Sequence, residues 1–295
     1  MKILIKLAYI SLLILIPSFF SCLNHDLPPS SIQPLSMPNI GNTCFSAAAL
    51  QVFLSGAREE ILSKNYEPKS ILGQFAALLQ SPHNEKLGVF FKEVLQKTGC
   101  PFGRQQDSLV FYLAFLDVLK KEDPDLIANF LIKKRSTLYS CDSHSDIDNS
   151  KINLESPSLL LSDQGASIQE ALDKFLKSHL DSCGIGGCTK DCTKTIRADW
   201  PKNLVFFISS KNKPNLSENI IINKSSNNNN KAREYALIAV VVHDGSEAGG
   251  HYYAYVKYDN NWFKCDDDRI SLVDKAEVFS KKLAFQYIMY QEKSL

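Results

Sequence analysis

The sequence has no appreciable excess of charge of either sign. Its 295 residues include 33 lysines and arginines against 32 aspartates and glutamates, so the formal net charge is +1 at pH 7. A protein whose main partner is nucleic acid carries a basic excess, because it must neutralise phosphates. The charge balance therefore excludes nucleic acid as the expected principal partner. The composition, 44% hydrophobic and 22% charged, is ordinary for a globular protein of one large or two small domains.

Cysteines are also sparse. There are eight, at positions 22, 44, 100, 141, 183, 188, 192 and 265. This density is too low for a small domain held together by disulfides. Three of the eight fall between Cys183 and Cys192, which indicates a metal site or a local loop feature.

The N-terminus carries the strongest compositional signal. Residues 1–6 are basic, residues 7–20 are almost entirely apolar, and Ser21 precedes Cys22. This layout is typical of a secretory signal, and the cysteine also fits a relaxed bacterial lipoprotein site. An uncleaved membrane anchor is the alternative. We expect residues 1–23 to lie outside the fold and the protein to be exported or attached to a membrane through them.

A linker and one domain are expected after this segment. Residues 24–36 are rich in proline and serine, as extended linkers are. Helical patterns follow at residues 44–54, 71–80, 87–96, 107–121, 125–134 and 167–178. β-branched and aromatic runs follow at residues 204–208, 235–242, 251–258, 262–265 and 270–273. The pattern predicts an α+β domain over residues 37–295, with an Asn/Ser-rich surface loop at 215–231.

Cys44 is a candidate nucleophile because it begins a predicted helix. The positive end of a helix dipole favours a thiolate, and first-turn amides point toward a developing oxyanion. Gly41 would allow the preceding chain to turn tightly, and Gly56 would lie just past the end of this helix. The alternative is a buried cysteine that serves as a small hydrophobic residue.

A base for Cys44 is offered by His251, which opens a predicted strand after Gly249 and Gly250. The returning strand leads into three acids that begin at Asp266. Pairing of the two strands would bring a carboxylate beside the imidazole and fix its tautomer. Taken alone, a single histidine is more often structural, and three adjacent acids are more often a solvated turn.

Several segments resemble, in order, the boxes of the ubiquitin-specific proteases. They are NIGNTCF at 39–45 with Leu50-Gln51, QQDS at 105–108 with Phe111, WPKNL at 200–204, YALIAV at 235–240 with GGHYYAY at 249–255 and WFKCDD at 262–267, and AFQYIMY at 284–290. These segments span nearly all of the chain from residue 37 to residue 292. The chain is therefore identified as a member of this family from its sequence.

The resemblance implies a papain-like cysteine protease fold with a helical thumb, an antiparallel β-sheet palm and reduced fingers. It implies that Cys44 is the nucleophile, His251 the general base, Asp266 the residue that orients the histidine, and Asn39 a donor to the oxyanion. The substrate is then ubiquitin or a ubiquitinated protein, cleaved after the last glycine without any catalytic cofactor. The remaining expected contacts are with substrate, at Gly249, Gly250, Asp267 and Gln51.

The sequence differs from the family pattern at two places, and whether it binds the zinc found in many family members is a separate question. Val110 stands where the family usually has glutamate, and residues 209–211 replace a usual Lys-Arg-Phe, so details of ubiquitin contact are open. Family members often hold a structural zinc between two Cys-x-x-Cys pairs. Here Cys141-x-x-His144 is followed by cysteines at 183, 188 and 192 with irregular spacing. A zinc site, a site that has lost its metal, and a disulfide all remain open.

Rival functions come from other classes. One is a pseudoenzyme that binds ubiquitin without cutting it, and another is an exported cell-wall cysteine peptidase of the NlpC/P60 type. The N-terminal segment raises a further hypothesis, because ubiquitin is a cytosolic eukaryotic protein. A bacterial enzyme could reach a host cell and remove ubiquitin there. The alternative is a eukaryotic enzyme anchored to an organelle with its domain facing the cytosol.

Overall fold

The computed structural model describes residues 32–82, 84–148, 155–161, 165–208, 213–246, 249–281 and 283–293. Apart from Ile32, these residues belong to one compact unit, Gln33–Leu295. The predicted signal or anchor segment, residues 1–23, lies outside the described residues, as does most of the predicted linker. Within the described part of the chain, no helix is both long enough and apolar enough to cross a bilayer.

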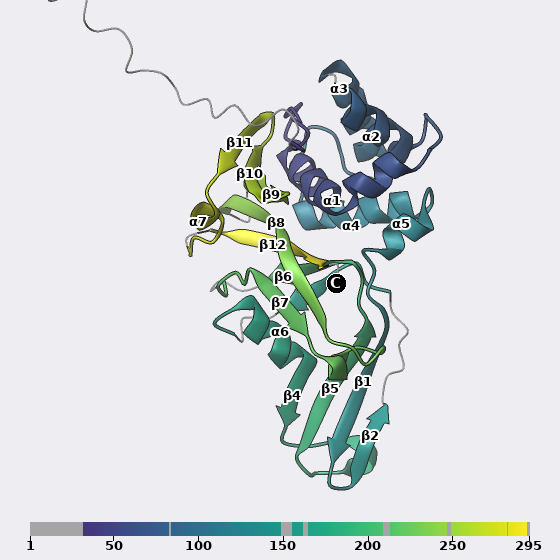
Figure 1. The fold of residues 1–295 in the computed structure, drawn as a ribbon, viewed down its shortest axis with the longest axis vertical. Helices are drawn as coiled ribbons and strands as arrows, with labels where there is room; N and C mark the ends of the chain where they lie inside the picture. The colour runs from purple at the N-terminus through teal and green to yellow at the C-terminus, as the bar shows by residue number, and fades with distance from the viewer. Residues whose placement is uncertain are drawn as a thin grey trace, which may run out of the picture. The chain divides into compact units, whose positions relative to one another are not determined.

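Helices make up the N-terminal half of this unit (Figure 1). They are α1 (Cys44–Ser63), α2 (Ile71–Gln80), α3 (Asn84–Lys97), α4 (Ser108–Lys120) and α5 (Pro124–Ala128). Ser70, Asp107 and Asp123 each cap a helix by accepting hydrogen bonds from first-turn amides. The inner faces meet in a cluster of aromatic rings, where Phe53 packs edge-on against Phe115 with centroids 5.3 Å apart.

Helix α1 is longer than the sequence predicts, because Gly56 does not end it. The helix continues to Ser63, and Gly56 lies inside it. A Cβ atom at Gly56 would lie 2.7 Å from Oδ1 of Asn203. Glycine is needed here for the close approach of a buried asparagine, not as a helix terminator, and the predicted end at residue 54 is wrong.

The C-terminal half is a largely antiparallel sheet. Its strands are β3 (Leu159–Leu161), β6 (Asn203–Ile208), β7 (Asn219–Ile222), β8 (Arg233–Ser246), β9 (Gly249–Tyr258), β10 (Asn261–Asp266), β11 (Arg269–Val273) and β12 (Phe285–Glu292). The strand order is β11-β10-β9-β8-β12-β6-β3, with β7 also paired to β8. Helix α1 packs against β8 and β9 at the middle of this sheet, and α7 (Lys275–Val278) lies between β11 and β12 in sequence. The α+β class predicted from the sequence is confirmed.

A second sheet was not predicted. It consists of β1 (Lys133–Cys141), β2 (His144–Asp148), β4 (Lys177–Leu180) and β5 (Cys192–Asp199), in the order β2-β1-β5-β4. The predicted helix at 125–134 is wrong, since α5 ends at Ala128 and β1 begins at Lys133 to pair with β5. Helix α6 (Ile168–Leu176) is confirmed, with Ser167 accepting from the Glu170 amide. Figure 1 shows this sheet at the opposite end of the compact unit from α1–α5.

The Asn/Ser-rich tract at 215–231 is also more ordered than predicted. It contains β7 and the short helix η2 (Lys224–Ser226). Ile220 and Ile222 are fully buried in the core beneath α6, because β7 pairs with β8 and turns alternate residues inward. The prediction of a loop throughout this tract is wrong, because three consecutive isoleucines at 220–222 carry a strand within a polar stretch.

Candidate active site and a Cys/His cluster

Cys44 is the first residue of α1 and is 4% exposed. Its sulfur accepts hydrogen bonds from the backbone N–H groups of Tyr252 and Phe45 and from its own. Burial nevertheless dominates and raises the pKa of the thiol, and the nearby carboxylate of Asp267 adds to that effect. Burial therefore outweighs the effect of the first-turn amides, which act in the direction expected from the helix position. Because Tyr252 directly follows His251, the same contact brings Cys44 to the start of β9.

His251 and Asp266 form the predicted pair. Nε2 of the imidazole lies 2.6 Å from Oδ1 of Asp266. Strands β9 and β10 create the pairing, with Ala254 opposite Cys265 in a hairpin that turns at Asp259 and Asn260. When an ionised Asp266 accepts this bond, Nε2 carries the proton and Nδ1 is left to exchange one with a thiol. The structure thus pairs His251 of β9 with Asp266 of β10, and it places Cys44 of α1 against the backbone of Tyr252, the residue after His251.

The loop before Cys44 is held by Asn39. Its Oδ1 accepts from the amides of Gly41 and Thr43, at 3.2 and 3.1 Å, and its Nδ2 donates to Oδ2 of Asp267 at 3.1 Å. Gly41 and Asn42 both have positive φ, 124° and 55°, so the chain turns sharply before the helix begins. Asn39 therefore connects the nucleophile loop to the acidic turn after β10.

Asp267 stands in that turn with φ of 55° and is half buried. Burial raises the pKa of its carboxyl, while the hydrogen bond from Asn39 and the charge of His251 oppose the shift. Its Oδ1 has no hydrogen-bond partner among the described residues. Its predicted role toward substrate stays a prediction; in this conformation it is the partner of Asn39.

Gln105, a residue of the QQDS segment, hydrogen-bonds to both the backbone N–H and the backbone carbonyl of Gly250. The Gln105 Nε2 donates to the Gly250 carbonyl, and Gly250 N donates to Gln105 Oε1 at 3.3 Å. A Cβ atom at Gly250 would lie 2.6 Å from the carbonyl oxygen of Asp244 on β8, so no side chain fits there. The glutamine thereby joins the segment before α4 to the strand that carries His251.

A cavity of about 610 Å³ lies beside this contact. Its lining includes Gln105, Gln106, Lys213, His243, Gly249 and Tyr252. His243 stacks on the Tyr252 ring with centroids 4.3 Å apart. The sequence offered no signal for His243 or Lys213, because neither belongs to a segment with recognisable spacing.

Two other predicted positions lie where their side chains can be described. Gln51 is 1% exposed and donates to the Leu35 carbonyl at 2.5 Å. This contact makes it a support for the chain that leads to Cys44, and its role toward substrate stays a prediction. Val110 is 59% exposed on the first turn of α4, where its amide donates to the capping Asp107.

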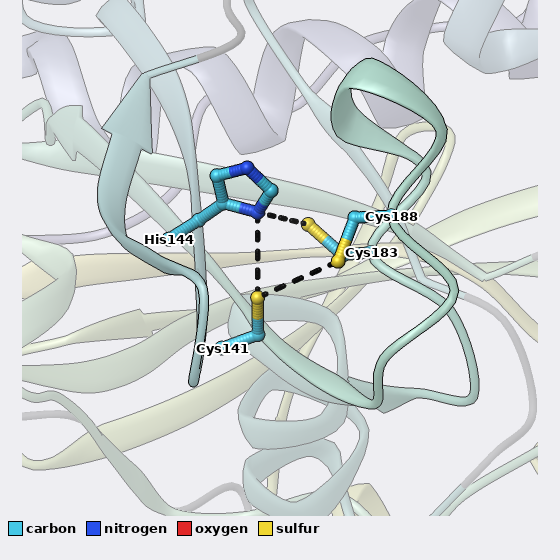
Figure 2. A group of neighbouring side chains, drawn as sticks. All are labelled: Cys141, His144, Cys183 and Cys188. Carbon is cyan, nitrogen blue, oxygen red and sulfur yellow. Dashed lines mark hydrogen bonds between the residues drawn. The ribbon is translucent and has the colours of Figure 1, made fainter.

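The cysteine pattern produces a compact cluster of Cys141, His144, Cys183 and Cys188 (Figure 2). Cys141 Sγ lies 3.4 Å from His144 Nδ1 and 3.9 Å from Cys188 Sγ, and Cys183 Sγ lies 3.5 Å from the same nitrogen. The four ligand atoms all lie within 4.8 Å of one another. Cys192, the fifth predicted member, is buried in β5 and is not in the group.

This spacing matches a tetrahedral zinc site. Zn–S bonds of about 2.3 Å and Zn–N bonds of about 2.0–2.1 Å require about 3.8 Å between sulfurs and about 3.6 Å between sulfur and nitrogen. Desolvation opposes ionisation of Cys141, but hydrogen bonds from the Ser143 backbone and His144 lower its pKa to about 7. The seven cysteines in the described residues are free thiols, so the disulfide alternative is not seen.

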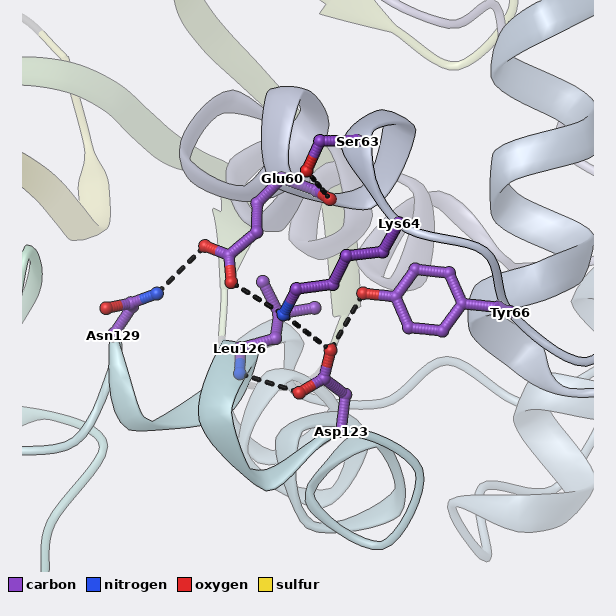
Figure 3. Close-up of polar contacts among 7 residues, drawn as sticks. All are labelled: Glu60, Ser63, Lys64, Tyr66, Asp123, Leu126 and Asn129. Carbon is purple, nitrogen blue, oxygen red and sulfur yellow. Dashed lines mark hydrogen bonds and ion pairs between the residues drawn. The ribbon is translucent and has the colours of Figure 1, made fainter.

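The far end of α1 is fixed by a polar network (Figure 3). Lys64 Nζ lies 2.9 Å from both Glu60 Oε1 and Asp123 Oδ2, and Tyr66 donates to the same Asp123 oxygen at 2.8 Å. Asn129 donates to the other oxygen of Glu60 at 2.9 Å. The network ties α1 to α5 and so anchors the helix whose first residue is Cys44.

Comparisons with known proteins agree with one another. The family model described as "Ubiquitin carboxyl-terminal hydrolase" matches residues 36–290. Ubiquitin carboxyl-terminal hydrolase 26 of Oryza sativa subsp. japonica is 26% identical over 286 residues, covering 83% of this chain and 26% of that protein. Ubiquitin carboxyl-terminal hydrolase 25 of Arabidopsis thaliana is 31% identical over 152 residues, covering 44% of this chain and 22% of that protein. The chain thus spans about a quarter of the length of these relatives.

Solved structures give the same fold. The SAGA Ubp8/Sgf11/Sus1/Sgf73 DUB module bound to ubiquitin aldehyde matches with a TM-score of 0.71 and 18% identity, over 91% of this chain and 72% of that chain. The same module bound to monoubiquitin matches with a TM-score of 0.70 and 18% identity, over 99% of this chain and 75% of that chain.

Proposed function

The chain belongs to the ubiquitin carboxyl-terminal hydrolase family, and on this premise we propose that it is a cysteine-type deubiquitinase. Its fold is the expected papain-like α+β fold, with α1–α5 as thumb, the larger sheet as palm and the four-stranded sheet as fingers. The observation that carries the proposal is the His251–Asp266 hydrogen bond next to Tyr252, whose backbone contacts Cys44 where α1 meets β9. The reaction is hydrolysis of the peptide or isopeptide bond after the last glycine of ubiquitin.

In this mechanism Nδ1 of His251 takes the proton of the Cys44 thiol, while Nε2 stays bonded to Asp266. Sγ then attacks the glycine carbonyl carbon, and the imidazolium returns the proton to the leaving amine. A thioester remains on Cys44. The same imidazole next activates water, which releases ubiquitin and restores the thiol. Because burial raises the pKa of Cys44, proton transfer to His251 is required to generate the thiolate.

The oxyanion would be stabilised by amides around the start of α1. The backbone N–H of Cys44 belongs to the first turn of α1, whose amides have no partner within the helix. Asn39 has two side-chain N–H donors, of which one is bonded to Asp267. The second is free to face a developing negative charge. Asp267 would therefore orient the amide of Asn39, which gives the second acid a part separate from that of Asp266.

Ubiquitin is the proposed substrate because its tail ends in two glycines. The two solved neighbours named above hold ubiquitin aldehyde and monoubiquitin. In this chain, Gly249 and Gly250 beside His251 leave no side chain to obstruct a narrow extended peptide. The adjoining cavity between Gln105 and Tyr252 would receive the residues that precede the glycines.

The Cys/His cluster would hold a structural zinc through Cys141, His144 Nδ1, Cys183 and Cys188. The interatomic distances support this ligand set, and the donors are those that zinc prefers. Bound there, zinc would join the β1–β2 hairpin to the glycine-rich turn before β5. Catalysis needs no cofactor in this proposal, because acid–base chemistry is supplied by His251.

The place of action is a separate proposal. Residues 1–23 would export or anchor the protein, and the enzyme would then meet ubiquitin in a host cell. An organelle-anchored enzyme facing the cytosol is the alternative. Fractionation during infection tests this proposal, since a protein found only inside a sealed bacterial periplasm would contradict it.

The test of activity is covalent capture. The full chain, and the same chain with Cys44→Ala, are mixed with ubiquitin that bears a C-terminal electrophile. An adduct that forms only with Cys44 supports both the nucleophile and ubiquitin recognition. Binding without an adduct by a folded protein would favour the pseudoenzyme. If the folded protein neither binds ubiquitin nor forms an adduct, the result would favour a different modifier or a peptidase with another substrate.

A further inference from the structure

Lys264 lies next to the proposed catalytic pair but takes no part in the mechanism above. It precedes Asp266 by two residues on β10, so both side chains project from the same face of the sheet. Its Nζ lies 3.8 Å from Oδ2 of Asp266, the oxygen that does not bind His251. The two carboxylate oxygens thus have different partners: imidazole on one and ammonium on the other.

The ammonium group is also held from its other side. Nζ lies 4.3 Å from the centroid of the Tyr253 ring, within the range of a cation–π contact. Tyr253 is two residues after His251 on β9 and shares its face. Its ring packs edge-on against Tyr255, whose hydroxyl donates to Glu277 at 2.7 Å. Tyr253 is therefore fixed, and Lys264 is confined between its ring and Asp266.

The groups around His251 are otherwise mainly acidic. Asp244 pairs with His251 across β8 and β9, Asp266 binds it, and Asp267 follows in the turn. Tyr253 lies near the charges of Asp244, Asp266 and Glu277. Lys264 places a positive charge among these acids. A cation paired with Asp266 at this distance would both orient the carboxylate and offset the surrounding negative charge.

We propose that Lys264 is a positioning residue for catalysis, which holds Asp266 so that its Oδ1 stays on His251 Nε2 and which keeps the imidazole ready to accept a proton. The inference rests on the proposed function for its role in turnover. Its geometric part concerns the Lys264–Asp266–His251 arrangement and is testable without ubiquitin.

The test compares Lys264→Met, Lys264→Arg and the control Lys257→Met in the full chain. Lys257 lies on the same face of β9, opposite Trp262, and its loss removes the same charge from the same hairpin. For cleavage of ubiquitin with a C-terminal fluorogenic amide, Lys264→Met should lower kcat about two- to fivefold with KM nearly unchanged. Lys264→Arg keeps the positive charge and should have a kcat close to that of the parent chain. Lys257→Met should also have the kcat of the parent chain.

The pH profile separates positioning from strand stability. Loss of a nearby cation makes protonation of the imidazole easier, so the acid limb of kcat/KM should move to higher pH. The expected shift is about 0.2–0.7 pH unit for Lys264→Met and none for Lys257→Met. A lower melting temperature of Lys264→Met with an unchanged acid limb of kcat/KM would overturn the proposal. A raised KM with unchanged kcat would also overturn it, because Lys264 would then contact the substrate.

A measurement without ubiquitin distinguishes failure of the Lys264 proposal from failure of the deubiquitinase proposal. Alkylation of Cys44 by chloroacetamide, followed against pH, reports the coupled thiol and imidazole. If the parent chain ignores ubiquitin, the deubiquitinase proposal fails, yet a shifted alkylation profile in Lys264→Met still supports the arrangement. An unchanged alkylation profile would overturn the positioning role whatever the chain does with ubiquitin.

Discussion

The side-chain amide of Gln105 hydrogen-bonds to both the N–H and the C=O of Gly250, as a neighbouring peptide group would. This pairing crosses from the helical half to the strand that carries His251, one residue away. The position of the imidazole thus depends on a contact made in another part of the chain.

Replacement of Gln105 by alanine should weaken catalysis. Two neutral hydrogen bonds contribute about 0.5–1.5 kcal/mol each, so kcat/KM for a fluorogenic ubiquitin substrate should fall about fivefold or more. Gln106→Ala is the control, because Gln106 lines the same cavity without these two bonds. Equal losses in both variants would show that the cavity, and not the pairing with Gly250, sets the rate.

Alkylation of Cys44 should be slow at neutral pH and should accelerate as pH rises. The reason is that burial raises the pKa of this thiol, which lowers its thiolate fraction at pH 7. Asp267 contributes to the raised pKa, so Asp267→Asn should speed alkylation about two- to fivefold. The same variant should slow ubiquitin cleavage, because Asn39 loses its carboxylate partner.

The control for Asp267→Asn is Asp268→Asn, which removes an adjacent charge from the same turn. Alkylation rates are measured with chloroacetamide, and turnover with fluorogenic ubiquitin. Slower alkylation in Asp267→Asn would contradict the assigned direction of the Asp267 effect on Cys44.

Purified protein should carry one zinc per chain, measured by elemental mass spectrometry after dialysis against metal-free buffer. Cys141→Ser should lose most of the metal and lower the melting temperature by about 5–10 °C. His144→Cys should keep it, since four thiolates also bind zinc. Cys192→Ser should keep it too, because Cys192 lies outside the cluster. Metal that persists in Cys141→Ser but leaves Cys192→Ser would require a different ligand set.

Gly56→Ala should destabilise the protein by about 1–3 kcal/mol, because its Cβ would lie 2.7 Å from Asn203 Oδ1. Gly88→Ala supplies the matched control within α3. A Cβ there meets nothing within 4 Å, so the exchange should stabilise by up to about 1 kcal/mol. Chemical denaturation of both variants measures the difference, and equal effects would show that Asn203 moves aside freely.

The candidate site was predictable because its residues lie in short segments with chemical meaning. Cys44 at a helix start and His251 before a strand that returns to Asp266 can be recognised from the sequence alone. The structure pairs His251 with Asp266 and sets Cys44 against the backbone of Tyr252. The contact between Gln105 and Gly250 could not be derived in this way. It joins residues 145 apart in sequence, and only the packed halves place them side by side.

The predicted fold failed where long-range pairing outweighed local pattern. The sequence KKRSTLYSC of β1 has no alternating apolar face, and it is a strand because β5 and β2 pair with it on either side. Gly56 indicates a helix end when only its neighbours in sequence are considered, because its partner Asn203 is far away in sequence. Likewise, the irregular spacing of the cysteines does not tell which of them bind together. Only the geometry shows that Cys188 belongs to the cluster and Cys192 does not.

Asn203 also determines how the molecule comes apart. Its backbone N–H binds the Asn129 carbonyl, its Nδ2 donates to the Gly56 carbonyl at 3.4 Å, and its Oδ1 accepts from Gln291 at 3.0 Å. One buried residue, through its backbone and its side chain, thereby joins α1 and the end of α5 to β6 and β12. Thumb and palm should therefore melt as one cooperative unit, with slow amide exchange on both sides of Asn203. The four-stranded sheet shares this core through Ile196 and Ala198 of β5, so its outer strands β2 and β4 should exchange their amides sooner than β5 does.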